Sequence, residues 1–261
     1  MPRLDSELVA RGLARSRERA KEMISSGSIT VNGKIAKKPS DEVFSEDVII
    51  SSENDKYVGR GALKLEKAAK EFSIDLRGKK CLDIGASTGG FTDFMLQHGA
   101  ERVYAVDVGH GQLAESLVKD SRVINMEGTD IRNVTAEDIG GKADFISVDV
   151  SFISLTKILP KVYELLSDGA TAAVLIKPQF EAGRSDIGKR GIVKDKKVHF
   201  RILTDIDNFV RSIGFIADKY TFSPVRGGSG NIEYLVKLRK SVGESVIQDF
   251  KELINSSFSK L

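Results

Sequence analysis

The sequence predicts an α/β fold, a doubly wound and mainly parallel sheet, preceded by a small α+β domain. Between residues 60 and 240, short apolar segments typical of strands alternate with segments of helical periodicity. The expected strands are 80–83, 102–107, 123–125, 145–148 and 171–176, and the expected helices are 89–98, 111–119 and 154–166. Ligands bind such sheets beyond the carboxyl ends of the strands, so the site is expected at that edge.

Composition limits the alternatives. The 261 residues, 41% of them hydrophobic, allow one full-sized domain and one small domain. The N-terminus has no cleavage signal and no apolar run approaches ~18 residues, so we expect a soluble, cytoplasmic protein without a membrane partner. Cys81 is the only cysteine, which excludes an internal disulfide and disfavours methylation at pyrimidine carbon 5. The three histidines share no ligand spacing with it, so no metal site is expected.

The charge is unevenly distributed. The net charge is only +3, but residues 1–40 hold nine Lys/Arg against four Asp/Glu. Residues 184–201 hold seven against two. Two basic stretches on a nearly neutral chain favour an anionic polymer as partner. An ordinary solvated surface is the alternative for each stretch.

The first fifty residues predict two helices and a hairpin. Apolar residues recur at helical spacing within 4–14, and Ser16 is a suitable cap for a second helix that ends at Gly27. Asn32-Gly33 is typical of a two-residue turn within 28–35. Residues 41–55 hold six acids and no base, which marks the end of a domain at 1–55. A linker at 56–60, a main domain at 61–241 and a C-terminal segment at 242–261 are expected to follow.

This N-terminal pattern resembles the RNA-binding fold named after a small-subunit ribosomal protein, the S-four domain. The resemblance rests on Arg3-Leu4-Asp5, Leu13, Ser16-Arg17, Ala20, Ile24, Gly27 and Val31-Asn32-Gly33. It implies RNA contacts by the basic residues of the two helices, which are Arg3, Arg11, Arg15, Arg17, Arg19 and Lys21. A helical hairpin that only supports the main domain is the alternative.

A glycine-rich turn follows the first strand of the main domain. The residues concerned are Asp83, Gly85, Ser87, Thr88, Gly89, Gly90 and Phe91. The G-x-x-x-G-G spacing differs from the G-x-G-x-x-G of dinucleotide sites, and no lysine follows as in a phosphate-binding loop. Gly85 would let a ligand approach the backbone, and the Asp83 carboxylate suits an ammonium group. The combination resembles S-adenosylmethionine sites; a tight turn without a ligand is the alternative.

Two further aspartates follow strands. Asp107 ends the second strand, where a carboxylate can accept ribose hydroxyls. Asp130 follows the third strand and is expected to reach an adenine amino group. The alternative for both is a helix cap, because strand-end aspartates often begin helices.

Motifs along nearly the whole chain resemble the TlyA family, whose members are known as haemolysin A or as ribosomal RNA 2′-O-methyltransferases. The motifs are residues 61–64, 83–91, 149–155, 175–181 and 223–233. The catalytic domain is similar to FtsJ-type methyltransferases, which use a Lys-Asp-Lys-Glu tetrad. Matched motif by motif, the tetrad falls on Lys64, Asp149, Lys177 and Glu233. The resemblance implies S-adenosylmethionine as cofactor and a cytidine ribose in ribosomal RNA as substrate.

The tetrad suits that chemistry, because a ribose hydroxyl must lose its proton to become a nucleophile. Lys177 can accept the proton only as a neutral amine. A second ammonium at Lys64 favours that form, whereas Asp149 and Glu233 favour the charged form, orient the amines and balance the charge. Asp149 is also expected to contact the cofactor. A buried ion-pair network without catalysis is the alternative.

Other functions have weaker support. Methylation of base amino nitrogens usually uses Asn/Asp-Pro-Pro-aromatic, whereas this chain has Asp149-Val150-Ser151-Phe152. A pore would need a membrane segment. A ribosome-binding or assembly factor that kept the fold without useful catalysis is the alternative from another class.

Two segments complete the chain. Arg184, Lys189 and Arg190 lie in a glycine-containing loop after Lys177, which is expected to clamp RNA unless it is a solvated connection. A helix near 196–213 follows it. Residues 242–261 predict an amphipathic helix with Val246, Ile247, Phe250, Leu253 and Ile254 on its apolar face. The nucleotide, the ribosomal subunit and the oligomeric state are not indicated.

Overall fold

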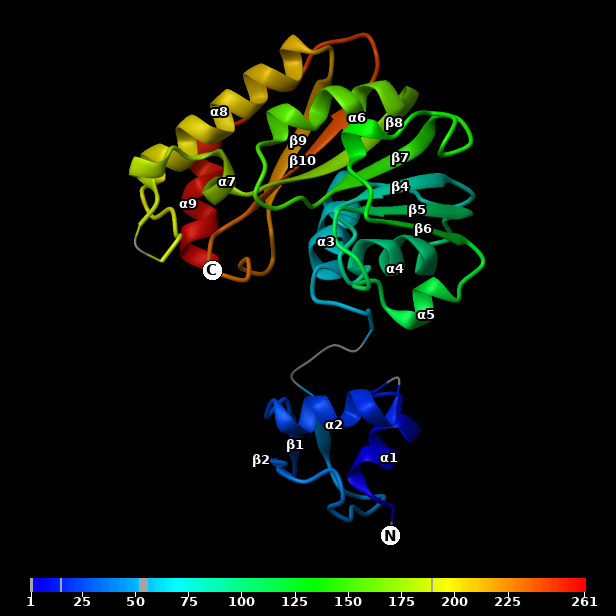
Figure 1. Ribbon diagram of the computed structural model, residues 1–261. Coiled ribbons are helices and arrows are strands. Elements are labelled where there is room, and N and C mark those ends of the chain that lie inside the picture. Colours follow the sequence, from blue (N-terminus) through cyan, green and yellow to red (C-terminus); the bar gives the residue numbers. More distant parts are fainter. Residues whose placement is uncertain (1, 15, 52–55, 189) are drawn as a thin grey trace. The chain divides into compact units, whose positions relative to one another are not determined.

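The computed structural model describes residues 2–14, 16–51, 56–188 and 190–261. The chain forms two compact units, Met1–Val58 and Gly59–Leu261 (Figure 1). Each unit has its own sheet and its own hydrophobic core.

The N-terminal unit packs two helices on a three-stranded sheet of order β2-β1-β3. Its elements are α1 (Leu4–Ala10), α2 (Arg17–Ser25), β1 (Ile29–Val31), β2 (Lys34–Ile35) and β3 (Ile49–Ser51). The Ser16 hydroxyl accepts a hydrogen bond from Arg19 N (3.1 Å), as expected for a helix cap. Asn32 and Gly33 have φ of +50° and +78°, which a two-residue hairpin turn requires. The short strand β3 is not apparent in the acidic segment that contains it.

The large unit contains a seven-stranded sheet of order β6-β5-β4-β7-β8-β10-β9. The strands are β4 (Lys80–Ile84), β5 (Arg102–Asp107), β6 (Val123–Glu127), β7 (Ala143–Val148), β8 (Leu166–Ile176), β9 (Ile216–Phe222) and β10 (Tyr234–Arg239). The strands β6, β5, β4, β7 and β8 are mutually parallel, whereas β10 is antiparallel to both β8 and β9. The predicted α/β class with a mainly parallel sheet is confirmed.

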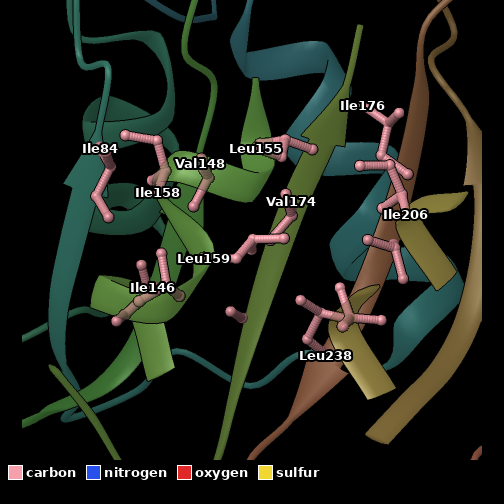
Figure 2. Packing of buried hydrophobic residues seen from close by; sticks show 14 of the residues in the cluster. Ile84, Ile146, Val148, Leu155, Ile158, Leu159, Val174, Ile176, Ile206 and Leu238 are labelled. Carbon is pink, nitrogen blue, oxygen red and sulfur yellow. The ribbon is translucent and has the colours of Figure 1, made fainter. Parts of the chain in front are cut away.

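Helices cover both faces of this sheet (Figure 1). They are α3 (Ala62–Phe72), α4 (Gly90–Gln97), α5 (Glu115–Val118), α6 (Leu159–Leu165), α7 (Pro178–Glu181), α8 (Lys196–Ser212) and α9 (Phe250–Lys260), with 3₁₀ turns η1 (Ile131–Asn133), η2 (Leu155–Lys157) and η3 (Arg184–Asp186). Figure 2 shows part of the core, where Ile158 and Leu159 pack with Val148 and Val174 of the sheet. This core fixes the strand ends that carry the candidate site.

Two predicted helices are shorter than expected. Segment 111–119 forms only α5, because the N–H groups of Gln112 and Leu113 donate to Glu127 Oε1 (2.6 and 3.0 Å). Segment 154–166 divides into η2 and α6, with a proline in the first turn of α6. Proline lacks the N–H that would continue the preceding turn.

The C-terminal segment also differs from the prediction. Helix α9 begins only at Phe250, where the Asp249 side chain accepts Glu252 N (3.0 Å). Val246 and Ile247 therefore lie outside the helix and are 53% and 93% exposed. Helix α3 and strands β9 and β10 were not predicted as elements.

Candidate functional site

The candidate site lies at the carboxyl ends of β4, β7 and β8. Two hollows open there, one of about 410 Å³ and one of about 240 Å³. Residues that line both are Gly85, Ser87, Asp149 and Ser151. We call them the larger and the smaller cavity. Strand β4 lies between β5 and β7, and from it the strand order runs outward in both directions along the sheet. Doubly wound sheets bind ligands at this point.

The larger cavity contains both strand-end aspartates. Asp107 accepts hydrogen bonds from Ser87 N and Gly109 N (both 2.8 Å). Asp130 accepts from Arg132 N (2.9 Å) and pairs with the Arg132 guanidinium (2.5 Å). Asp130 therefore caps η1, as the alternative interpretation holds, and also lines the cavity. The cavity wall combines these acceptors with apolar side chains such as Val106 and Ile158.

The glycines bring backbone segments together. Gly85 has φ +84°, and a Cβ there would lie 2.5 Å from Asp149 O, so the turn after β4 packs against the end of β7. A Cβ at Gly90 would lie 3.0 Å from Ala62 N, at the start of α3. Gly89 was expected at the cofactor's edge, but a Cβ there would collide with Leu113 and Leu117. Among the described residues that line the two cavities, Gly89 is absent, whereas Thr88, Gly90 and Phe91 are present.

Asp83 lies beneath the turn rather than at a cavity wall. It is fully buried, and its oxygens accept hydrogen bonds from Thr92 Oγ1 (2.7 Å) and Ser147 Oγ (2.9 Å). This corrects the expectation that Asp83 meets an ammonium group directly. Burial raises the pKa of its carboxyl group to about 6.

Asp83→Asn should change the pH dependence of stability. At pH 8 the wild-type carboxylate is ionised in both states and its burial is destabilising; as pH falls from about 6 to 3.8, the folded state takes up the proton first and this cost disappears. Relative to wild type, the variant should thus be more stable at pH 8 than at pH 4: the difference in unfolding free energy, variant minus wild type, should be about 2–3 kcal/mol larger at pH 8. Urea unfolding at both pH values measures it. Asp205→Asn, on the exposed side of α8, is the control, and an equal difference at both pH values would contradict the prediction.

The four predicted tetrad residues come together. Lys64 Nζ lies 2.8 Å from Glu233 Oε2 and 3.4 Å from Asp149 Oδ2. Lys177 Nζ lies 2.5 Å from Asp149 Oδ1. The groups form a row, Glu233–Lys64–Asp149–Lys177. Lys177 and Asp149 line the smaller cavity. Lys64 contacts Asp149 and Glu233, and neither Lys64 nor Glu233 is among the described residues that line this cavity.

Separate elements supply these groups. Helix α3 carries Lys64, and the residues following β7 and β8 are Asp149 and Lys177. Glu233 precedes β10, and the pairing of Tyr234 with Ile176 brings it to the same edge. Burial would lower the pKa of Lys64, but Asp149 and Glu233 together raise it above its ordinary value. Lys64 is therefore a permanent cation at neutral pH.

Several groups beside the tetrad were not expected in the site. Lys177 Nζ donates a hydrogen bond to Ser151 Oγ (2.9 Å). Phe152 is 91% exposed, has φ +63° and contacts the Phe180 ring (5.0 Å between centroids). Glu181 accepts hydrogen bonds from Ser154 Oγ (2.7 Å) and Leu155 N (2.8 Å). These contacts join the loop after β7 to the segment after β8.

Comparison with known proteins identifies the family. A family model for FtsJ-like methyltransferases matches residues 57–240, and one for the S4 domain matches residues 2–49. The chain is 48% identical to YqxC of Bacillus subtilis over 238 residues, 90% of this chain and 85% of that protein. The protein named 16S/23S rRNA (cytidine-2′-O)-methyltransferase TlyA of Mycobacterium tuberculosis is 42% identical over 239 residues, 91% of this chain and 89% of that one.

The chain belongs to the TlyA family of FtsJ-like methyltransferases. The solved structure of a presumed hemolysin from Streptococcus thermophilus, 41% identical, agrees with this assignment. It covers 99% of this chain and 96% of that chain with a TM-score of 0.79. The resemblance expected from the motifs is confirmed, and the large unit is a methyltransferase domain.

In this TlyA-family chain, three of the predicted RNA-contacting arginines have structural partners. Arg3 and Arg17 both pair with the buried Asp5 (3.1 and 3.0 Å), and hydrogen bonds from Arg3 hold the pKa of that carboxyl group well below its usual range. Arg11 donates to Glu7 and to the carbonyl oxygens of Asp47, Phe44 and Ser45. Its guanidinium ties α1 to the segment before β3, so we remove Arg11 from the RNA-contacting set.

The other basic residues are on the surface. Arg19, whose side chain is 40% exposed, and the exposed Lys21 pair with neighbouring acids of α2. Arg184 and Arg190 are exposed. Arg15 and Lys189 lie outside the described residues.

In the part of the chain that the structure describes, no group of three or more His, Cys, Asp or Glu side chains is arranged to hold a metal ion. None of the helices described is both long and apolar enough to cross a membrane. Cys81 is buried, which raises the pKa of its thiol to about 12.

Proposed function

We propose that this protein transfers a methyl group from S-adenosylmethionine to the 2′-hydroxyl of a cytidine in ribosomal RNA, in the cytoplasm. The observation that carries the proposal is the Lys177 amine at the smaller cavity, in contact with Asp149 and backed by Lys64 and Glu233. The substrate is inferred from the name of the Mycobacterium tuberculosis relative.

The cavity residues fit the cofactor. The larger cavity offers carboxylate acceptors at Asp107 and Asp130 beside apolar walls, which suits a nucleoside. It meets the smaller cavity at Gly85, Ser87, Asp149 and Ser151, where the rest of an elongated ligand would lie. We assign cofactor contacts to Gly85, Ser87, Thr88, Gly90, Phe91, Asp107, Asp130 and Asp149. Asp83 and Gly89 support the turn from beneath. When bound, the cofactor supplies a methyl group already activated by its sulfonium charge.

The tetrad then needs only to position the hydroxyl and remove its proton. Neutral Lys177 accepts the proton. Asp149 holds the Lys177 amine and stabilises the ammonium that forms. Lys64, kept charged by two carboxylates, balances Asp149, and Glu233 fixes Lys64. The Phe152 ring is 91% exposed, so it offers a surface on which the substrate base can stack.

Transfer of label tests this proposal. The protein, ribosomal subunits and methyl-labelled S-adenosylmethionine are incubated, and the label is mapped by nuclease digestion and mass spectrometry. We expect 2′-O-methylcytidine at a defined position. Label on a base, or cofactor and ribosome binding without transfer, would contradict it; the second result indicates a non-catalytic assembly factor.

Asp107→Ala should weaken S-adenosylmethionine binding about 5- to 150-fold in calorimetry, since a lost polar contact is worth about 1–3 kcal/mol. The matched control is Glu127→Ala. Glu127 pairs with Asp107 across β5 and β6 and also accepts two backbone N–H groups, but it is absent from the cavity-lining residues described above. Equal losses in the two variants would mean that Asp107 acts only through the loop.

A further inference from the structure

We propose that Ser151 is a positioning residue that sets the direction of the Lys177 amine, so that its lone pair faces the substrate hydroxyl. This inference rests on the proposed function and adds a fifth side chain to the tetrad. It starts from a difference between the two contacts of Lys177.

The contact to Asp149 is close but poorly directed. Lys177 Nζ lies 2.5 Å from Asp149 Oδ1, yet the angles there do not satisfy hydrogen-bond geometry. The contact to Ser151 Oγ, at 2.9 Å, does satisfy it. Asp149 therefore supplies attraction, which depends weakly on angle, and Ser151 supplies the directional bond.

Direction matters because a neutral amine has two hydrogens and one lone pair. With one N–H on Ser151 Oγ and the other toward Asp149, the lone pair takes the remaining position on Nζ. Lys177, Asp149 and Ser151 all line the smaller cavity. On this proposal the lone pair therefore points into that cavity, where the reacting groups would meet. Without Ser151, rotation about the terminal bond would spread the lone pair over several directions.

The proposed step balances. The proton of the 2′-hydroxyl passes to the Lys177 lone pair, giving an ammonium. The oxygen–methyl bond forms while the methyl–sulfur bond breaks, and that electron pair goes to sulfur. The positive charge on sulfur is thus replaced by a positive charge on Lys177. Ser151 then accepts a hydrogen bond from this ammonium group, and Asp149 forms an ion pair with it.

The fold holds Ser151 in place from both sides. Asp149 N donates to Ile84 O (2.9 Å), which anchors the loop start to β4. Glu181 accepts Ser154 Oγ and Leu155 N, which anchors the loop end to the segment that carries Lys177. Phe152, between them, adopts a left-handed conformation that the loop must support. Such fixation is what a directional contact requires.

Ser151→Ala tests the proposal, with Lys157→Ala as the control at the end of the same loop, because Lys157 is exposed and takes no part in holding Ser151 or Lys177. We expect kcat to fall about 10- to 100-fold in Ser151→Ala, with the KM values and the calorimetric Kd for S-adenosylmethionine within about threefold of wild type. Ser151→Thr, which keeps the hydroxyl, should restore most of kcat. The control should stay within about threefold of wild-type kcat.

A second measurement does not depend on turnover. In protein labelled with ¹⁵N-lysine, hydrogen exchange at Lys177 Nζ, assigned with Lys177→Arg, should be several-fold faster in Ser151→Ala than in wild type or Lys157→Ala. An unchanged or raised kcat, a loss confined to cofactor binding, or unchanged exchange would overturn the proposal. Failure of the proposed function appears differently, as a wild-type protein that makes no 2′-O-methylcytidine.

Discussion

Lys177→Ala should abolish methyl transfer while leaving RNA affinity nearly unchanged. The amine is the only group of the tetrad that both lines the smaller cavity and can accept a proton in neutral form, so its loss should lower kcat about 10²- to 10⁴-fold. Lys177→Arg should fail as well, because guanidinium stays protonated and its planar head does not match an amine. Label incorporation into ribosomal subunits and filter binding to the same subunits measure the two quantities.

Lys157→Ala is the matched control, since this exposed lysine of η2 lies in the neighbouring loop. It should retain near wild-type transfer. Thermal unfolding of all three variants separates lost chemistry from lost fold. Substantial transfer by Lys177→Arg would rule out the proposed proton acceptor.

Removal of residues 1–55 should weaken RNA binding and flatten its dependence on salt. Each phosphate contact that is lost lowers the slope of log affinity against log salt by about 0.7 to 0.9. The cut leaves Gly59, Arg60 and Gly61, which line the smaller cavity, and the large unit keeps its own sheet and core. We therefore expect the truncated protein to fold and bind S-adenosylmethionine, but to methylate ribosomal RNA very slowly.

Two point variants refine this experiment. Arg19→Gln should reduce RNA affinity and the salt slope in the full chain, because Arg19 is a surface residue of α2. Arg11→Gln should instead lower the stability of the N-terminal unit, since Arg11 joins α1 to the segment before β3. Full methylation by the truncated protein at low ribosome concentration, or loss of its cofactor binding, would contradict this division of roles.

The sequence was informative where periodicity and motif order carry the signal. The five parallel strands and the Asn32-Gly33 turn follow from local patterns, and the family follows from five motifs in order. The proposed tetrad residues were also identified from these motifs. Their arrangement as the row Glu233–Lys64–Asp149–Lys177 could not be predicted, because it depends on the position of α3 and on the antiparallel pairing of β10 with β8. Both elements have a local pattern, apolar residues at helical spacing in α3 and an apolar run in β10, but neither pattern indicates which strand β10 pairs with.

The errors arose where burial decides a residue's role. Asp83 and Gly89 belong to the turn, yet one bonds two buried hydroxyl groups and the other packs on two leucines. Arg11 was expected to be a surface cation. It binds four oxygens, and three of them are backbone carbonyl oxygens, which the sequence of side chains does not reveal. Ser151 gave no signal of its own, since only the strand ends bring it to Lys177.

The antiparallel strand β10 has a mechanical consequence. Lys177 and Glu233 extend from the ends of two strands joined by six successive residue pairs, from Tyr234 with Ile176 to Arg239 with Thr171. That wall of the site is as stiff as the sheet. The opposite wall is the loop after β7, held by a few side-chain bonds. Any adjustment to an incoming nucleotide should therefore come from exposed side chains of that loop such as Phe152, while Ser151 and the proton acceptor stay still.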